Sequence, residues 1–259
     1  MKKWKDIYNN TYVKVPVAMI IDAQQKHYSK ELRLFLLLKL LYKNGKVKLT
    51  TGALIELGRL TQIKARKTTI KHLNFLKEKG WIRLNSQTGF FIIGSFDMIR
   101  IENNWLNRLS FQISISNYYK IKAVTGAVIY GYLHKDFWRK VKRDKSVQIK
   151  GSTYHFKSFN FNYKERSAPV SVLGLHEIFG ISHSEASRLK KFAQDAKFIK
   201  VKKNFSNEEF DESKANYERK YFLEEKGKKI VNRKGKYRYQ LIDTITPLFY
   251  FSKRKNLGT

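Results

Sequence analysis

The first hundred residues carry hydrophobic positions in a helical pattern and then in a strand pattern. Residues 30–44 have apolar side chains on nearly every side, which is typical of a helix buried in a small core. Ser29 is expected to be its N-cap and Asn44-Gly45 its end. The predicted order is a helix 30–44, a strand 46–50, helices 52–60 and 64–79 around a turn 61–63, and a hairpin of strands 81–84 and 90–94.

The same order of patterns returns in the second half of the chain. The predicted elements there are a long helix 116–143, strands within 147–164, a helix 172–180 opened by Pro169 and Ser171, a helix 184–195 and a strand 198–205. One offset of 116 positions relates the apolar residues of the two copies: Ile70, Leu73, Leu76 and Ile82 match Ala186, Leu189, Phe192 and Phe198. The first three residues of each set define the packed face of a helix, 64–79 in the first copy and 184–195 in the second. Under this offset Ala196 replaces Gly80, which weakens the signal that ends the second helix.

Three further segments join or extend the two copies. Residues 109–114 alternate between apolar and polar and predict a strand. The acidic segment 207–218 predicts an exposed loop, and 226–242 predicts a hairpin that turns at Lys234-Gly235. Residues 251–259 predict a basic, mobile tail.

The charge of the chain points to a partner. Lys and Arg total 53 against 21 Asp and Glu, which gives a net charge of +32. A fold this positive repels itself, so we expect a polyanionic partner, nucleic acid first and an anionic membrane second. The alternative is a basic protein whose charge serves solubility alone.

What the sequence lacks disfavours several classes of protein. The chain has no cysteine, which excludes disulfides and thiolate metal sites. The longest apolar run, 32–42, is too short to span a membrane, and no apolar segment follows the basic start at once, so we expect a cytoplasmic protein without a membrane partner. No glycine-rich phosphate loop, zinc-protease motif or clear carboxylate set occurs. We therefore expect no enzymatic activity, metal, cofactor or small-molecule substrate.

Residues 29–94 resemble a winged-helix domain. The resemblance rests on the order of elements and on Thr69, Ile70, Leu73, Leu76, Gly80 and Ile82, which are similar to that family's third helix and first wing strand. It implies an α+β fold, mostly helical, with two winged helix-turn-helix domains in tandem. The expected division is 1–100 for the first domain with an N-terminal extension, 101–115 for a linker or connecting strand, 116–250 for the second domain with an elongated wing, and 251–259 for the tail.

In winged-helix proteins the second helix of the helix-turn-helix enters the DNA major groove, and the wings touch the backbone or minor groove. The expected DNA contacts are Lys64, Lys67, Thr68, Lys71 and His72 on the first helix, His183, Ser184, Ser187, Arg188 and Lys191 on the second, and Arg83, Gln87, Lys202, Arg233, Lys236 and Arg238 in the wings. Arg188 is the strongest candidate for a base contact, because its planar fork matches guanine O6 and N7. The alternative for Arg188 is a surface ion pair with Glu185 or Asp195, and for the lysines a solvated helix face.

The sequence therefore predicts sequence-specific binding of double-stranded DNA. The tandem arrangement, size and charge resemble the replication initiators of plasmids and other mobile elements. A transcription regulator of a phage or mobile element, a non-specific packaging protein and an RNA-binding protein are alternatives, and so is a homodimer paired through strand 109–114. The aromatic residues of 152–164 fit either a stacking platform for single-stranded bases or a strand with one buried aromatic face, and we favour the buried face.

Overall fold

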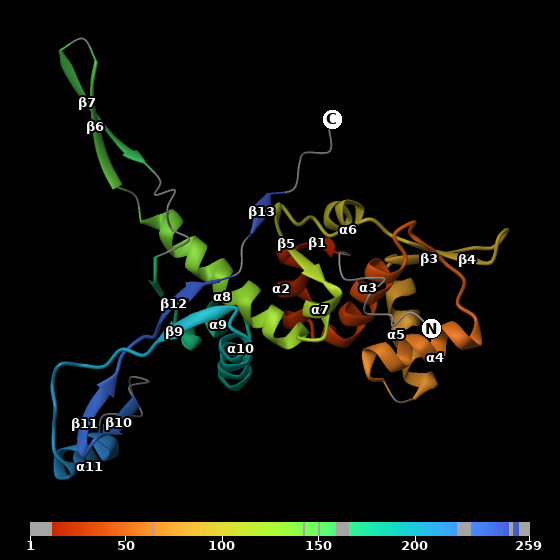
Figure 1. Ribbon diagram of the computed structural model, residues 1–259. Helices are drawn as coiled ribbons and strands as arrows, with labels where there is room; N and C mark the ends of the chain where they lie inside the picture. The colour runs from red at the N-terminus through yellow and green to blue at the C-terminus, as the bar shows by residue number, and fades with distance from the viewer. Residues whose placement is uncertain are drawn as a thin grey trace.

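Helices make up about half of the residues that the structure describes, and the strands form small sheets, so the fold is α+β as predicted. The structure is a computed structural model that describes residues 12–63, 65–141, 143–149, 151–158, 166–221, 229–248 and 251–253. Figure 1 shows a body of packed helices from which two extensions leave at one end. Within the described ranges, no helix is both long and apolar enough to cross a membrane.

The first unit has the element order predicted for residues 29–94. Its elements are α3 (Ser29–Leu41), β2 (Lys46–Val47), α4 (Thr51–Thr61), α5 (Arg66–Glu78), β3 (Ile82–Asn85) and β4 (Phe90–Ile93). The strand β4 pairs antiparallel with both β2 and β3, which gives a three-stranded sheet in the order β2-β4-β3.

The second unit repeats this order and this sheet topology. Its elements are α8 (Ile121–Lys140), β8 (Ala168–Pro169), α9 (Val172–Phe179), α10 (His183–Asp195), β9 (Ile199–Lys202) and β12 (Thr244–Pro247). The strand β12 is central and pairs antiparallel with β8 and β9, so the sheet order is β8-β12-β9. The strands β2, β4 and β3 of the first unit thus correspond to β8, β12 and β9 of the second.

Two insertions distinguish the second unit from the first. Between α8 and β8, β6 (Arg143–Ile149) and β7 (Ser152–Ser158) form a two-stranded ribbon, which we call the ribbon. Between β9 and β12, residues 203–243 form what we call the insertion, with α11 (Glu212–Tyr221), β10 (Lys229–Arg233) and β11 (Lys236–Gln240). Figure 1 shows the ribbon, in green, and the insertion, in blue, leaving the body in different directions.

A third sheet and three short helices join the two units. The elements are β1 (Tyr12–Pro16), α2 (Val17–Gln25), α6 (Phe96–Glu102), β5 (Leu109–Ser114), α7 (Ile115–Tyr118) and β13 (Ser252–Lys253). The strand predicted at 109–114 is therefore present as β5. It lies between β1 and β13. All of β1 pairs with residues 110–114 of β5, and β13 pairs with the first two residues of β5. Because β1 occupies one edge of β5 and β13 the start of the other, β5 is the inner strand of this sheet, and a homodimer paired through it stays a prediction.

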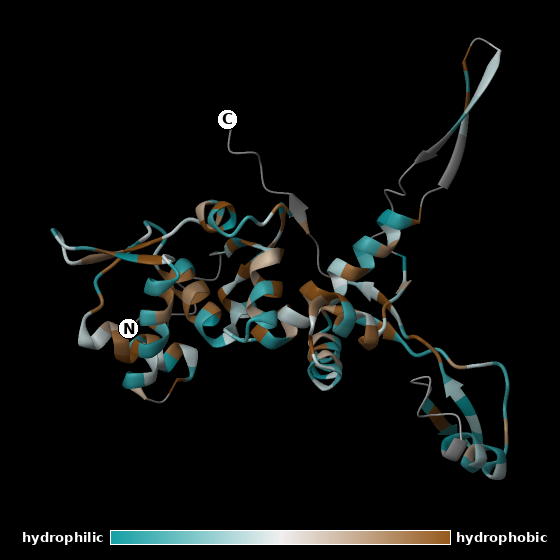
Figure 2. Ribbon diagram, turned by 180° about the vertical axis from the view of Figure 1, so that it is seen from behind, coloured by the Kyte–Doolittle hydropathy of each residue, from teal (hydrophilic) through white to brown (hydrophobic). Residues whose placement is uncertain are grey.

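The buried apolar residues of both units form one continuous cluster, which reaches from Val15 to Ile245. The helix α8 is at its centre and is buried on nearly every side between Ala123 and His134. Figure 2 shows this body from behind, coloured by hydropathy. The insertion has a small separate cluster: Phe210, Ala215, Ile230 and Tyr237. The two units thus share a core, and the insertion packs on itself.

Several predicted boundaries are wrong for local reasons. Ser29 is the first residue of α3 rather than its N-cap, because its hydroxyl donates back to the carbonyl oxygen of Ala23 in α2 (3.4 Å). Helix α3 ends at Leu41, before the predicted Asn44-Gly45. Only the first two residues of the strand predicted at 46–50 form a strand, which is β2.

Further along the chain, the long helix predicted at 116–143 is divided into α7 and α8. The loop predicted at 207–218 contains the start of α11, whose Ala215 is fully buried. The tail predicted at 251–259 begins with residues paired in β13, and 254–259 lie outside the described residues.

Candidate nucleic-acid interface

The two units position α5 and α10 by the same local signals. The hydroxyl of Thr50 accepts a hydrogen bond from the amide of Ala53 (3.3 Å) at the start of α4, and Ser171 does the same for Gly174 (2.8 Å) at the start of α9. Helices α4 and α9 each end at a residue in the left-handed conformation, which is Gln62 with φ +59° for α4 and Gly180 with φ +65° for α9. A tight turn then leads into α5 or α10.

Helices α5 and α10 are the same length and correspond at an offset of 117 rather than the predicted 116. Each has 13 residues, from 66 to 78 and from 183 to 195. Both are ended by a residue with positive φ, Gly80 at +69° and Lys197 at +58°. The amide of the next residue reaches back into each helix, from Trp81 to Leu76 (2.9 Å) and from Phe198 to Ala193 (2.9 Å). Lys197, and not Ala196, therefore takes the place of the glycine.

The packed face of α5 keeps the predicted Leu73 and Leu76 but turns toward Thr69 and His72 and away from Ile70. Its buried residues are Thr69, His72, Leu73 and Leu76, whereas Ile70 is 36% exposed. His72, predicted to face DNA, is 6% exposed, and its Nδ1 lies 2.6 Å from Oε1 of Glu31 in α3. The expected DNA contact by His72 is wrong, because α3 presents a carboxylate to this side of the helix.

The packed face of α10 shows the same shift. Ala186, Leu189 and Ala193 are buried, and Phe192, predicted to be packed, is 38% exposed. The helix lies against α8 at Gly126, where a side chain would collide with the carbonyl group of Leu189.

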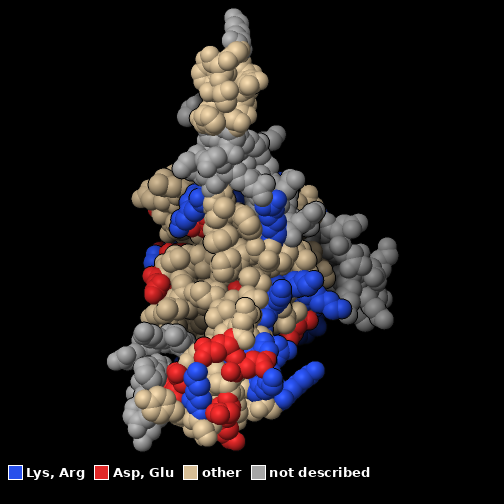
Figure 3. Space-filling view, turned by 90° about the vertical axis from the view of Figure 1, so that its left-hand side faces the viewer, with Lys and Arg blue, Asp and Glu red and all other residues tan. Residues whose placement is uncertain are grey.

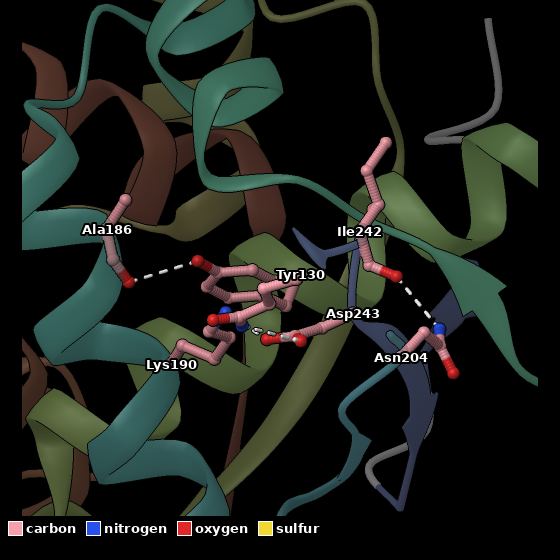
Figure 4. A network of polar contacts seen from close by, with 7 residues as sticks. Tyr130, Ala186, Lys190, Asn204, Ile242 and Asp243 are labelled. Carbon is pink, nitrogen blue, oxygen red and sulfur yellow. Dashed lines mark hydrogen bonds and ion pairs between the residues drawn. The ribbon is translucent and has the colours of Figure 1, made fainter. Parts of the chain in front are cut away.

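Polar contacts fasten α10 in this orientation. Figure 4 shows the hydroxyl of Tyr130 donating to the carbonyl oxygen of Ala186 (3.0 Å), and Lys190 paired with Asp243 (2.6 Å). Burial raises the pKa of the Tyr130 hydroxyl, which keeps it protonated as a donor. Lys190 and Asp243 are both largely buried, so they tie α10 to the end of the insertion. The face of α10 opposite these contacts is left to solvent.

The outward faces of α5 and α10 hold most of the residues that were predicted to bind DNA from these two helices. Lys67 and Lys71 are exposed on α5 and Thr68 is half-buried, while Lys64 lies outside the described residues. On α10 the exposed residues are His183, Ser184, Ser187, Arg188 and Lys191. Arg188 forms the surface ion pair expected as its alternative, with Glu185 at 2.8 Å. Exposed pairs of this kind contribute little, so the guanidinium is available to another anion.

Three further residues belong to the exposed side of α5: Arg66 and Asn74, which the sequence did not single out, and Ile70, which was predicted to pack. Arg66, Ile70 and Asn74 are exposed on α5 beside Lys67 and Lys71. At the offset of 117 they correspond to His183, Ser187 and Lys191 of α10. Helical geometry alone places Asn74 on the side away from Leu76, whereas Arg66 is exposed as the first residue of α5.

The strands β3 and β4 form a short hairpin with a polar turn. The turn is closed by Asn85, whose Oδ1 accepts from the amides of Gln87 (3.0 Å) and Thr88 (3.1 Å), and the side chain of Gln87 is exposed. Arg83 pairs with Glu102 of α6 at 2.8 Å. In the second unit, Lys202 is exposed near the end of β9.

Two of the basic residues of the insertion share one acidic partner. Lys236 pairs with Glu209 (2.5 Å), and Arg238 pairs with the same carboxylate. The guanidinium of Arg233 lies over the ring of Phe205, 4.5 Å from its centre. Figure 3 shows acidic and basic side chains intermixed at this end of the molecule. Arg233, Lys236 and Arg238 are therefore separate from the two helices and weaker candidates for phosphate contact than Lys67 and Lys71.

The ribbon has no buried aromatic face among the side chains that the structure describes. Residues 146–149 and 151–155 are all exposed, including Tyr154, which pairs across the ribbon with Val147. The predicted strands are present, but the favoured interpretation of the aromatic residues is wrong for this part, and 159–165 lie outside the described residues.

The described residues contain no group of three His, Asp or Glu side chains that could hold a metal ion. Comparison of the chain with protein-family models, curated proteins and solved structures gave no match.

Proposed function

We propose that both units are winged helices and that the chain binds double-stranded DNA at specific sequences, with α5 and α10 in two successive major grooves. The observation that carries this proposal is the common register of the two helices, which turn one side to the shared core and an exposed polar side to solvent. A major groove admits one α-helix, and helices that follow a tight turn in this way read base edges. The net charge of +32 supplies the attraction to phosphates.

The first unit offers the simpler electrostatic surface. The first turn of α5 holds Arg66 and Lys67 and no acidic residue, so side chains and helix dipole both favour a phosphate. The first turn of α10 holds Glu185, which Arg188 partly neutralises. We therefore expect α5 to supply more of the salt-dependent affinity and α10 a larger share of base contacts.

The biological role that we propose is initiation of replication on a plasmid or mobile element. The support is the tandem pair of similar units on one strongly basic chain. An initiator separates the strands beside its site, whereas a transcription regulator that binds in the same way leaves them paired. Permanganate reactivity of thymines next to the bound site distinguishes the two roles.

Selection from random duplexes with the full chain, at about 0.15 M salt, tests the binding proposal. We expect one enriched sequence, longer than a single helix can read. Enrichment from a parallel RNA pool and none from DNA would assign the interface to RNA. Binding without any enriched sequence would leave a packaging protein as the better description.

Two charge-matched variants test whether α5 is the contact surface. Lys67→Ala removes an exposed cation from α5, and Lys236→Ala removes an exposed cation from the insertion, away from α5 and α10. We expect Lys67→Ala to weaken binding and to lower the slope of log K against log salt by about 1. Lys236→Ala should change neither the affinity nor the slope by more than the measurement error. Equal losses would mean that the whole surface attracts DNA without a defined site.

A further inference from the structure

The corrected register places the outward residues of the two helices in pairs. At an offset of 117, the buried Thr69, His72 and Leu76 coincide with the buried Ala186, Leu189 and Ala193. The exposed positions must then coincide as well, because the helices have equal length and the same end. The exposed pairs are Arg66 with His183, Lys67 with Ser184, Ile70 with Ser187, Lys71 with Arg188, and Asn74 with Lys191.

The chemistry differs at every one of these pairs. The first unit presents the aliphatic Ile70 and, one turn later, the amide of Asn74, both exposed. An aliphatic side chain in the major groove contacts the methyl group of thymine, and an asparagine amide matches N6 and N7 of adenine. At the equivalent positions the second unit presents a hydroxyl and an ammonium group, with Arg188 beside them. A guanidinium matches O6 and N7 of guanine.

We infer that the duplex site consists of two unlike halves, an A·T half read by α5 through Ile70 and Asn74 and a guanine-containing half read by α10 through Arg188. This inference rests on the proposed function. Ile70 and Asn74 are four residues apart, which is about 6 Å along the helix axis. Base pairs are about 3.4 Å apart, so the thymine and the adenine should lie within about two base pairs of each other.

The position of Ile70 allows it a role in reading as well as in folding. It borders the packed face, one turn before the buried Leu73, and its other neighbours are the exposed Lys67, Lys71 and Asn74. Ile70 is 36% exposed, so part of the isoleucine packs at the edge of the core and part is open to a ligand. In the groove, the lysines on either side can hold phosphates while the branched side chain meets a base edge.

A variant with its outward residues exchanged tests the inference. Ile70→Ser, Lys71→Arg and Asn74→Lys together give α5 the outward residues of α10 at these three positions. All three side chains are exposed, so the thermal unfolding of the variant should match that of the wild type. Selection from random duplexes with both proteins should return two unlike halves for the wild type. For the exchanged variant, the A·T half should be replaced by a second guanine-containing half at the same spacing.

Single variants assign each base. On the selected site, Ile70→Ser should reduce the preference for thymine at one position, and Asn74→Ala the preference for adenine nearby, each by roughly 5-fold to 150-fold. Two identical halves for the wild-type protein, or an unchanged site for the exchanged variant, would overturn this inference and leave the proposed function in place. No enriched duplex for the wild-type protein would overturn both.

Discussion

Gly126 of α8 lies against the backbone of Leu189 of α10, so closely that a methyl group on Gly126 would come within 2.8 Å of the carbonyl carbon of Leu189. Because backbone atoms cannot move aside as a flexible side chain does, Gly126→Ala must push the two helices apart. We expect the free energy of unfolding to fall by roughly 1–3 kcal/mol, as measured by chemical denaturation. The same displacement should weaken the hydrogen bond between Tyr130 and Ala186.

Gly52 of α4 provides the matched control. It is also a helical glycine, but a methyl group on it would meet only the hydroxyl of Thr50, at 4.0 Å. Gly52→Ala should therefore leave stability unchanged or raise it by up to about 1 kcal/mol, through the better helix propensity of alanine. Equal effects of the two substitutions would mean that α8 and α10 are not in backbone contact.

Gly80 and Lys197 hold equivalent left-handed positions, at φ +69° and +58°, but only one of them is a glycine. A side chain in this conformation costs about 1 kcal/mol. We expect Lys197→Gly to raise the stability of the protein by about 0.5–1 kcal/mol and Gly80→Lys to lower it by about 1 kcal/mol. Changes of the same sign in the two reciprocal variants would contradict the equivalence of the two helix ends.

His134 is a buried histidine whose ring nitrogen Nε2 lies 2.5 Å from the carbonyl oxygen of Arg166. Burial lowers its pKa below the usual 6.5, although the hydrogen bond to Arg166 opposes this shift. Above pH 6.5 the ring is neutral in both folded and unfolded chains, so it adds no pH dependence. Below that pH the unfolded chain binds the proton more readily, and stability should fall as the solution is acidified.

Unfolding of the wild type and of His134→Gln at pH 7.5 and pH 5.5 measures this effect. Glutamine retains a donor for the carbonyl oxygen of Arg166 but does not titrate. The loss of stability on acidification should be smaller in the variant. An equal loss in both proteins would assign the pH dependence to other groups.

The ribbon should contribute little to the stability of the body. Its described side chains, 146–149 and 151–155, are all exposed, and an isolated two-stranded ribbon is marginally stable in water. Replacing 143–158 by a short Asn-Gly turn should change the free energy of unfolding by less than about 0.5 kcal/mol. A large loss, or unfolding that is no longer cooperative, would mean that the ribbon packs on the body.

One of the three residues predicted to pack is exposed in each of α5 and α10, which shows how far a helical pattern can be read without the fold. Ile70 and Phe192 are apolar, and the sequence predicted them on the packed side, yet both are exposed. Thr69 and His72 are polar and buried. Hydrophobicity alone cannot rank a threonine above an isoleucine, since the choice depends on which side chains the opposing helix offers. Glu31 of α3 makes the buried position of His72 favourable, and only the tertiary arrangement brings it there.

The sequence by itself determined the order of elements in the first unit, the turns at Gly80 and Lys234-Gly235, and the charge that favours a polyanionic partner, but in the second unit it did not predict β8 or β12. These features depend on local backbone preferences and composition, which a chain carries wherever it folds. The tertiary structure alone decided three others. It joined β1, β5 and β13 into one sheet, merged the two units into a shared core, and selected which side of α5 and α10 faces solvent. Each of these depends on contacts between residues far apart in the chain, and such contacts leave no periodic signal in the sequence.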